Sequence, residues 1–312
     1  MDEDYPRTLL EFEDRFRTEE ACSAYLVGLR WPQGFRCPRC GHGQAWRLQR
    51  GLFQCRGCQA MVSATAGTIF HRSHLPLRVW FRAIWWVTNQ KSGLSAVGLQ
   101  RALGLGSYKT AWTCLAKLRR AMVRPSREPL TEEVEVDEVF IGGVEKGGGK
   151  RHRGTKALVA IAAEVRGPGI GRIRMRQIPD ASAQSLEGFV QEAVAPGAAV
   201  VTDGWTAYPG LEELGYVHRP RVVRTSGQSA WSLLPRVHRV AALLKRWLLG
   251  IHQGRVSRKH LGEYLDEFTF RFNRRLSRYR GKLFYRLLQQ AVAIEPTPFK
   301  HLVAERTSHS KT

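Results

Sequence analysis

Four of the six cysteines occur in two closely spaced pairs that could hold a metal ion. Two residues separate Cys37 from Cys40, two separate Cys55 from Cys58, and 14 residues lie between the pairs. Each Cys-x-x-Cys places two thiolates on one tight turn, and two such turns supply the four sulfur ligands of a structural Zn²⁺ site. The spacing therefore predicts zinc, with thiol redox chemistry or an iron–sulfur cluster as the alternatives.

The surrounding residues favour a zinc ribbon over residues 31–72. Gly41 and Gly57 suit the two turns, and His42 is expected to be a bystander because four thiolates already close the site. Cys22 and Cys114 are expected to be ordinary buried cysteines. Arginines in and just before this stretch favour contact with DNA, with a protein-binding ribbon as the alternative: Arg30, Arg36, Arg39, Arg47, Arg50 and Arg56.

Two aspartates could hold catalytic metal ions. Asp137 lies within the alternating strand pattern Val134–Phe140, where an unpaired carboxylate is costly to bury, and Asp203 ends another apolar run. Aspartates on neighbouring strands can share Mg²⁺ ions, which stabilise the attacking and leaving oxygens of phosphoryl transfer. Either aspartate alone could instead be a turn or strand-end residue. Glu135 shares a strand face with Asp137 and could support the site, while Glu138 points to the other face; neither is assigned a role.

A basic segment follows the second aspartate. His238 comes 35 residues after Asp203, and Lys245 comes seven residues later. Seven residues are two helical turns, so His238 and Lys245 share one helix face. His238 could instead only pack or bind phosphate, and Lys245 could belong to a solvated face. Arg239 and Arg246, which directly follow them, are expected to contact DNA.

These residues require a sheet and helices to position them. Strands are predicted at residues 134–140, 156–165, 172–178 and 198–202, and helices at 182–194, 237–249 and 259 to about 293. Strands that give way to a mixture of helices and strands indicate a mixed α/β class, with a central sheet flanked by helices.

A second helical region precedes the strands. Helices are predicted at 95–103 and 107–123, separated by the turn Gly104–Gly106. This pattern fits a helix-turn-helix segment, whose second helix enters the major groove by its N-terminal residues. Ser107, which is also a credible N-cap, Tyr108, Lys109 and Trp112 are therefore expected near DNA. A plain helical core is the alternative.

The charge of the chain indicates a polyanionic partner. The 312 residues carry a net charge of +22. No Asp or Glu occurs from Ala21 to Arg127, where there are 17 Lys and Arg, or from Leu214 to Gly262, where there are 10. No run of 18 apolar residues predicts a membrane span, and the acidic N-terminus has no secretory signal pattern. Paired cysteines in a cytosolic protein indicate metal rather than disulfides.

Several stretches together resemble the zinc-ribbon insertion-sequence transposases of the DDE superfamily, in the group with an ISXO-type catalytic domain. They are Cys37–Cys58, Val136–Gly143, Thr202–Tyr208, His238–Gly254 and Tyr264–Arg275. The resemblance implies an RNase H-like fold with Asp137 on its first strand and Asp203 after its fourth. It also implies that both aspartates bind Mg²⁺ or Mn²⁺.

The resemblance implies a third catalytic position at the start of a C-terminal helix, followed two turns later by a lysine. The superfamily usually has Glu there. This chain has no acid between Glu213 and Glu263, so His238 is the residue at the expected spacing, and Lys245 would contact DNA near the scissile phosphate.

The resulting expectation is a DNA transposase that binds the ends of its insertion element and catalyses strand cleavage and strand transfer. The alternatives are a zinc-ribbon DNA-binding regulator with an inactive RNase H-like domain, and a nuclease that cuts without joining. The expected partners are double-stranded DNA and further copies of the chain, with no membrane, in a bacterial-type cytoplasm at the nucleoid. Expected domains are a helical lead-in (1–30), the ribbon (31–72), the helix-turn-helix segment (73–126), the catalytic domain (130–295) and a tail (296–312).

Overall fold

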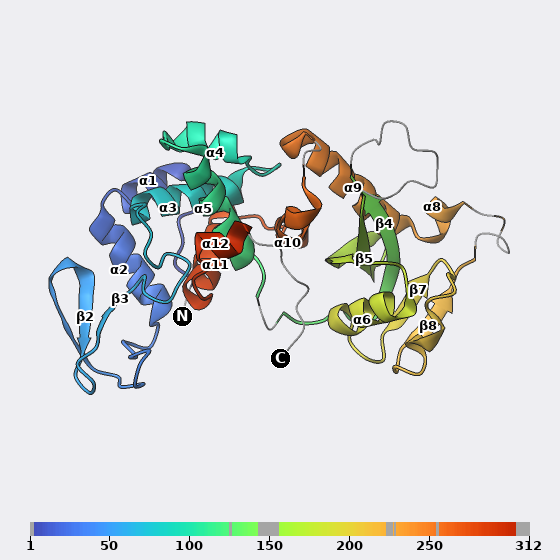
Figure 1. Ribbon diagram of the computed structural model, residues 1–312, viewed down its shortest axis with the longest axis horizontal. Coiled ribbons are helices and arrows are strands. Elements are labelled where there is room, and N and C mark those ends of the chain that lie inside the picture. Colours follow the sequence, from blue (N-terminus) through green and yellow to red (C-terminus); the bar gives the residue numbers. More distant parts are fainter. Residues whose placement is uncertain are drawn as a thin grey trace. The chain divides into compact units, whose positions relative to one another are not determined.

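The computed structural model describes residues 3–124, 127–142, 156–222, 227, 229–253 and 256–303. These residues form two compact units (Figure 1). The ribbon unit consists of Met1–Arg124 together with Leu276–Ala304, and the sheet unit lies within Pro125–Arg275. Among the described residues, no helix is both long and apolar enough to cross a membrane.

The ribbon unit begins with two short helices, α1 (Leu9–Arg15) and α2 (Glu19–Arg30). Each starts at a threonine whose hydroxyl accepts a hydrogen bond from a backbone N–H in the first turn, which is the usual N-cap interaction. Phe12 stacks on Trp85 with ring centroids 4.6 Å apart, so α1 is tied to the unit's aromatic core.

The metal-binding segment forms a three-stranded antiparallel sheet of β1 (Ala45–Arg47), β2 (Leu52–Cys55) and β3 (Met61–Ser63). A 3₁₀ turn (Gln49–Gly51) joins the first two strands.

Three helices follow: α3 (Leu77–Asn89), α4 (Ala96–Leu103) and α5 (Tyr108–Ala121). Ser95 and Ser107 cap α4 and α5 by accepting backbone hydrogen bonds. The predicted pair of helices around Gly104–Gly106 is therefore present, and Ser107 is an N-cap as expected. Helix α3 buries Trp80, Phe81, Ile84 and Trp85 in the core of the ribbon unit.

The C-terminal helices differ from the sequence expectation. The sequence predicts one helix from about 259 to 293, whereas the structure has α10 (Leu261–Asn273) in the sheet unit and α11 (Arg280–Ala293) in the ribbon unit. The Asn273 side chain accepts a 2.7 Å hydrogen bond from the backbone N–H of Ile173 and donates a 3.1 Å bond to its carbonyl, which fixes the end of α10 on a strand. Helices α11 and α12 (Phe299–Val303) then pack in the ribbon unit, so the sheet unit ends near 275 rather than at the expected 295.

The sheet unit is built on five strands: β4 (Glu133–Ile141), β5 (Ala157–Arg166), β6 (Gly169–Ile178), β7 (Ala199–Thr202) and β8 (Val217–Pro220). Their order is β6-β5-β4-β7-β8. The first three in sequence pair antiparallel, while β7 runs parallel to β4 and β8 parallel to β7. Strand β8 has no apolar alternation, and the sequence does not predict it.

Helices cover both faces of this sheet. Helix α6 (Ala183–Ala193) packs on the face that carries Val134 and Val136. Helices α9 (Pro235–His252) and α10 pack on the opposite face, against Val159 and Ile161. In Figure 1 the strands lie between α6 and α9. Because β4 alternates, Glu135 and Asp137 share the α9 face, where the helix can bring side chains to them.

Candidate functional site

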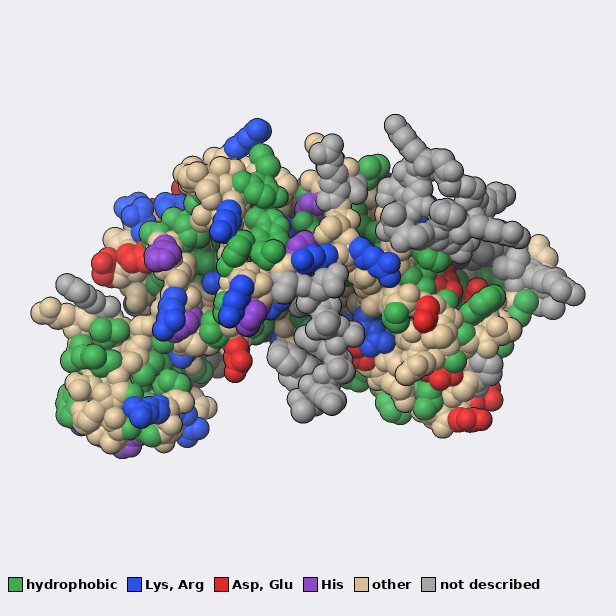
Figure 2. Space-filling model, viewed as in Figure 1, with side chains coloured by type: hydrophobic (Ala, Val, Ile, Leu, Met, Phe, Trp, Pro, Cys, Tyr) green, Lys and Arg blue, Asp and Glu red, His purple; other side chains and the backbone are tan. Residues whose placement is uncertain are grey.

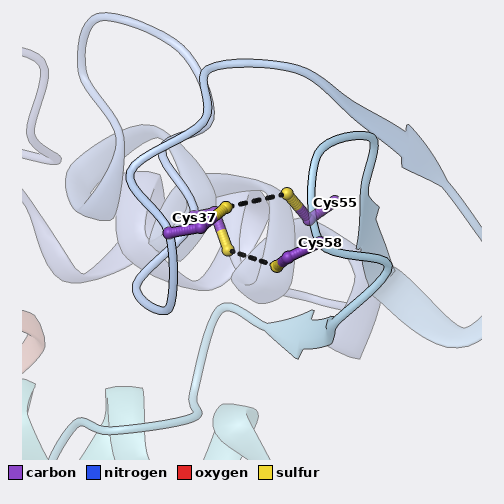
Figure 3. A group of neighbouring side chains, drawn as sticks. Cys37, Cys55 and Cys58 are labelled. Carbon is purple, nitrogen blue, oxygen red and sulfur yellow. Dashed lines mark hydrogen bonds between the residues drawn. The ribbon is translucent and has the colours of Figure 1, made fainter.

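The four paired cysteines converge in the ribbon. Their sulfur atoms all lie within 4.8 Å of one another, with Cys37–Cys58 at 3.7 Å and Cys40–Cys55 at 3.5 Å. A tetrahedron with Zn–S bonds of about 2.3 Å has sulfur–sulfur edges of about 3.8 Å. Figure 3 shows Cys37, Cys55 and Cys58 pointing toward one another from two turns. The geometry and donor set therefore fit a structural zinc ion.

The turns that carry the cysteines use their glycines differently from the prediction. Gly41 has a φ of 74°, and Gln59, not Gly57, takes the matching left-handed position after the second pair, with a φ of 58°. Gly57 relieves crowding instead: a Cβ there would lie 3.1 Å from Cγ of His42, a tight contact. His42 thus packs across the second turn, and the described cysteine cluster does not include it.

Backbone hydrogen bonds also favour the thiolate form of the first cysteine. Burial opposes the charge on Cys37, but backbone N–H groups of Cys40 and Arg39 stabilise it, and the pKa of Cys37 falls to about 6. Metal binding requires thiolates, so the turn prepares this ligand. By contrast, burial raises the pKa of Cys22 to about 12, as expected for a cysteine that only packs.

In the sheet unit, α9 brings His238 to Asp137. The His238 Nδ1 atom lies 3.6 Å from Asp137 Oδ2, and both side chains are about one-fifth exposed. Asp203 follows β7, and its Oδ1 accepts a 3.0 Å hydrogen bond from the backbone N–H of Trp205. Burial and, less strongly, the charge of Asp203 raise the pKa of Asp137 to about 7, against a lowering hydrogen bond from the Glu138 N–H. The structure thus brings His238 to Asp137, and Asp203 is near enough for its charge to act on Asp137.

Glu138 also belongs to this neighbourhood, which the sequence did not indicate. Its Oε2 accepts a 3.1 Å hydrogen bond from the hydroxyl of Tyr208, a fully buried residue. Burial and the charges of Asp137 and Asp203 raise the pKa of Glu138 to about 7 despite that bond. The charges of Asp137 and Asp203 therefore both oppose the ionisation of Glu138.

The described residues supply no strong cation to neutralise these carboxylates. No described Lys or Arg forms an ion pair with Asp137 or Asp203. Acidic side chains whose charges repel, with a histidine beside Asp137, fit a divalent cation held by oxygen ligands. Asp137 and Asp203 are the residues that would hold Mg²⁺ or Mn²⁺.

Glu135 has a structural partner instead of a place among the metal ligands. It is fully buried, and its Oε2 accepts hydrogen bonds from the backbone N–H groups of Arg236 (2.7 Å) and Val237 (2.9 Å). Its Oε1 accepts a 2.9 Å bond from the Arg236 guanidinium. Helix α9 starts with Pro235 and has no side-chain cap of its own. Glu135 therefore caps α9 from strand β4 and fixes the helix turn that carries His238.

The rest of α9 presents cations to solvent. Lys245, two turns after His238, is exposed, and so are Arg239 and Arg246. Their accessibility agrees with the expected phosphate contacts, which stay a prediction.

The expected base-contacting residues of α5 differ in their surroundings. Tyr108 is 53% exposed, and the Ser107 hydroxyl is used in capping. Lys109 Nζ lies 4.2 Å from the centre of the Phe299 ring of α12, and Trp112 meets the same ring edge-on at 6.3 Å. Tyr108 is therefore the residue of this set whose side chain is most accessible to DNA.

Charge is distributed unevenly between the units. Residues 1–124 and 276–304 have 24 Lys and Arg against 9 Asp and Glu, whereas residues 125–275 have 23 against 17. On the face shown in Figure 2, acidic side chains gather on the sheet unit, at the right of the view, and basic side chains are spread over both units. A polyanionic partner is therefore attracted most strongly to the ribbon unit.

Comparison with known proteins finds two family matches and a relative. Residues 17–61 match the family described as transposase zinc-ribbon domain, and residues 129–273 match the ISXO2-like transposase domain. A protein of Halobacterium salinarum, described as an uncharacterized protein in transposable element ISH50, is 27% identical over 287 residues, covering 86% of this chain and 94% of that protein. The matched segments contain all four paired cysteines, Asp137, Asp203 and His238. The chain is therefore similar to transposases, with a match to a transposase zinc-ribbon domain followed by a match to an ISXO2-like transposase domain.

Proposed function

We propose that this chain binds the ends of its insertion element and catalyses metal-dependent DNA cleavage and strand transfer. The observation that supports this most is the meeting of Asp137 with His238 at 3.6 Å, beside Asp203, in the segment that matches a transposase domain.

The sheet supports an RNase H-like catalytic domain. Its strand order, with three antiparallel strands followed by two parallel ones, places Asp137 on the central strand and Asp203 directly after a neighbouring strand. We propose this fold for the sheet unit, with zinc in the ribbon and a helix-turn-helix formed by α4 and α5.

Each polar residue has a proposed task. Asp137 and Asp203 bind the catalytic cation, Mg²⁺ or Mn²⁺, which when bound supplies positive charge for the developing oxyanions of phosphoryl transfer. His238 completes the site beside Asp137, and Lys245, Arg239 and Arg246 hold the DNA backbone along α9. Fixed charges that position the scissile phosphate supply most of the rate in such reactions.

The test is a strand-transfer assay with a labelled element end, a plasmid target and Mg²⁺. Wild-type protein is expected to nick the end and join it to the target. Asp137→Asn and Asp203→Asn should abolish both steps and leave end binding nearly intact, because phosphate contacts remain. Glu213→Gln, an exposed acid of the same unit, is the matched control and should be as active as wild type.

The outcomes separate the alternatives. Binding without Mg²⁺-dependent cleavage would indicate a DNA-binding regulator with an inactive domain, and cleavage without joining would indicate a nuclease. If the imidazole is a metal ligand, His238→Ala should lose most strand-transfer activity, and Mn²⁺ should restore more of that activity than Mg²⁺ does. His238→Glu should keep measurable activity. Undiminished activity of His238→Ala in Mg²⁺ would remove His238 from the active site.

DNA recognition has its own test. Tyr108→Ala and Lys109→Ala should reduce binding to element ends more than binding to random DNA, because base contacts carry sequence preference. Lys91→Ala, an exposed lysine before α4, should weaken binding to both DNAs equally. Equal losses for all three variants would refute the helix-turn-helix proposal. We expect the protein to work as a dimer or larger assembly on paired ends, at the nucleoid of a bacterial-type cytoplasm.

A further inference from the structure

Two tryptophans flank the proposed active site with much of their surface in solvent. Trp205, two residues after Asp203, is 51% exposed, and Trp231 of α8 (Ala230–Leu233) is 59% exposed. Exposing an indole forgoes the large free-energy gain of burying it. Such residues beside a reactive site therefore call for a partner.

Trp231 is held in a defined place beside His238. The two ring centroids are 5.2 Å apart and the ring planes are 31° from parallel, so the indole leans over the imidazole. The next residues, Leu233 and Leu234, are buried in the core shared with α9. Anchoring on one side and exposure on the other make Trp231 a fixed aromatic platform one ring away from Asp137.

The surroundings of this platform select the chemistry of its partner. Trp231 belongs to the stretch from Leu214 to Gly262, which has no acid and 10 Lys and Arg and therefore attracts anions, and the nearby Asp137 is a proposed metal ligand. Exposed aromatic rings among cations are typical of surfaces on which nucleobases stack. A base inside an intact duplex has both faces covered by its neighbours. Such an internal base can offer a face to an indole only after it has left the helix.

We infer that Trp231 stacks on one unpaired nucleobase of the DNA end while the adjacent phosphate lies at Asp137 and His238. The inference rests on the proposed function, since it assumes that DNA occupies this site. Trp231 would act as a positioning residue: it stabilises the extruded base and thereby fixes the scissile phosphate. Trp205 is assigned no such role, because its indole N–H donates to the Ala181 carbonyl at 3.4 Å and its backbone closes the turn of Asp203.

The experiment measures binding by protein that cannot cleave. The affinity for element ends is compared between the Asp137→Asn protein and the same protein with Trp231→Leu added. Leucine keeps an apolar side chain but has no aromatic face. The ends are either intact or carry a single abasic site, moved in turn to each position around the scissile phosphate. Trp231→Phe retains a ring, and Leu249→Ala removes another exposed apolar side chain of the sheet unit as a control.

Trp231→Leu is expected to weaken binding to intact ends by about 5- to 150-fold, the usual range for one stacked base. At one abasic position the two proteins should bind within about twofold of each other, because the base that Trp231 contacts is gone. Trp231→Phe should lose less than Trp231→Leu, and Leu249→Ala should bind like its parent.

An unchanged affinity of Trp231→Leu, or the same loss on intact ends and at every abasic position, would overturn the inference. Strand joining by the wild-type protein is a separate measurement. If the affinity loss of Trp231→Leu disappears at one abasic position but the wild-type protein joins no strands, the stacking is supported and the proposed enzymatic activity is refuted. If the wild-type protein joins strands but the affinity loss does not depend on the abasic position, only the stacking is refuted.

Discussion

Asp137 is a charge that the described protein does not neutralise. Its carboxylate is mostly buried, and the groups around it are Asp203, Glu138 and a histidine 3.6 Å away. In the folded, magnesium-free protein its pKa is about 7, compared with about 3.9 in an unfolded chain. Between these values the folded state binds more protons than the unfolded state, so the free energy of unfolding decreases as the pH rises from about 4 to 7.

The first prediction uses this linkage. Asp137→Asn should raise the free energy of unfolding of the sheet unit by about 1–3 kcal/mol at pH 8 without Mg²⁺, because the costly charge is absent. Below about pH 4 the variant should gain nothing. Hydrogen exchange of β4 and β7 amides in the full chain measures the effect. Mg²⁺ should stabilise wild type and not the variant; destabilisation by Asp137→Asn at pH 8 would mean that a protein group already compensates the charge.

At the residue scale, the sequence alone predicted those site residues that belong to recognisable motifs. Paired cysteines and aspartates at the ends of apolar runs are visible without a structure. Glu135 and Glu138 stood beside Asp137, but their tasks depend on Arg236, Val237 and Tyr208, which are about 70 to 100 residues away in the chain. No local pattern records such a partner. In the sequence, the only hints of these partners were the residues Tyr208 and Pro235, the proline that starts α9.

Two helices of the fold share a device at the scale of elements. Helices α3 and α9 both lack a side-chain cap from their own flanking residue. Glu19 of α2 accepts the backbone N–H groups of Leu77 (2.5 Å) and Arg78 (3.1 Å), and Glu135 does the same for α9. A carboxylate at a helix N-terminus satisfies free N–H groups and the positive end of the helix dipole. Each glutamate thereby links two elements that the sequence shows only separately.

The second prediction compares these caps. Glu135→Ala leaves Arg236 and two N–H groups of α9 without their buried partner, so it should cost about 3–5 kcal/mol. Glu19→Ala, at a partly exposed cap, should cost about 0.5–2 kcal/mol. Exchange rates of α9 and α3 amides would report each loss in its own unit. Equal, small effects would mean that water replaces Glu135 readily.

The third prediction concerns the ribbon. Cys37→Ser should remove the bound zinc, about one ion per chain, and unfold β1–β3, because metal binding and ribbon folding are coupled. Gly57→Ala keeps all four ligands but presses a Cβ to 3.1 Å from His42 Cγ, so zinc should bind more weakly. Adding His42→Ala to Gly57→Ala should restore much of the affinity. Metal content and competition with a chelator measure both effects, and full zinc binding by Cys37→Ser would contradict the site.

At the scale of the whole molecule, the chain leaves the ribbon unit at Arg124 and returns to it at Leu276. Apolar periodicity identified helical residues near 280–293, but it does not specify which surface they cover. Leu283, Phe284, Leu287 and Leu288 are buried in the ribbon unit, where Phe284 meets Phe12 edge-on at 5.3 Å. The sequence therefore predicted helical residues correctly but placed them in the catalytic domain instead of the ribbon unit. Their packing depends on aromatic residues near the N-terminus, such as Phe12.

The packing of α11 in the ribbon unit can be tested by adding a single methyl group to this helix. A Cβ at Gly281 of α11 would lie 1.6 Å from the Pro6 carbonyl oxygen, so the N-terminal segment must move away. That movement breaks the 2.8 Å ion pair between Glu3 and Lys282. Gly281→Ala should therefore destabilise the ribbon unit by about 1–3 kcal/mol, as overpacking usually does. Gly250→Ala is the matched control: it lies in α9 with nothing within 4 Å of its Cβ, so alanine's helix propensity should stabilise the sheet unit by up to about 1 kcal/mol. Hydrogen exchange should show opposite changes, each confined to one unit. Parallel changes in both units for either variant would mean that the two units unfold as one.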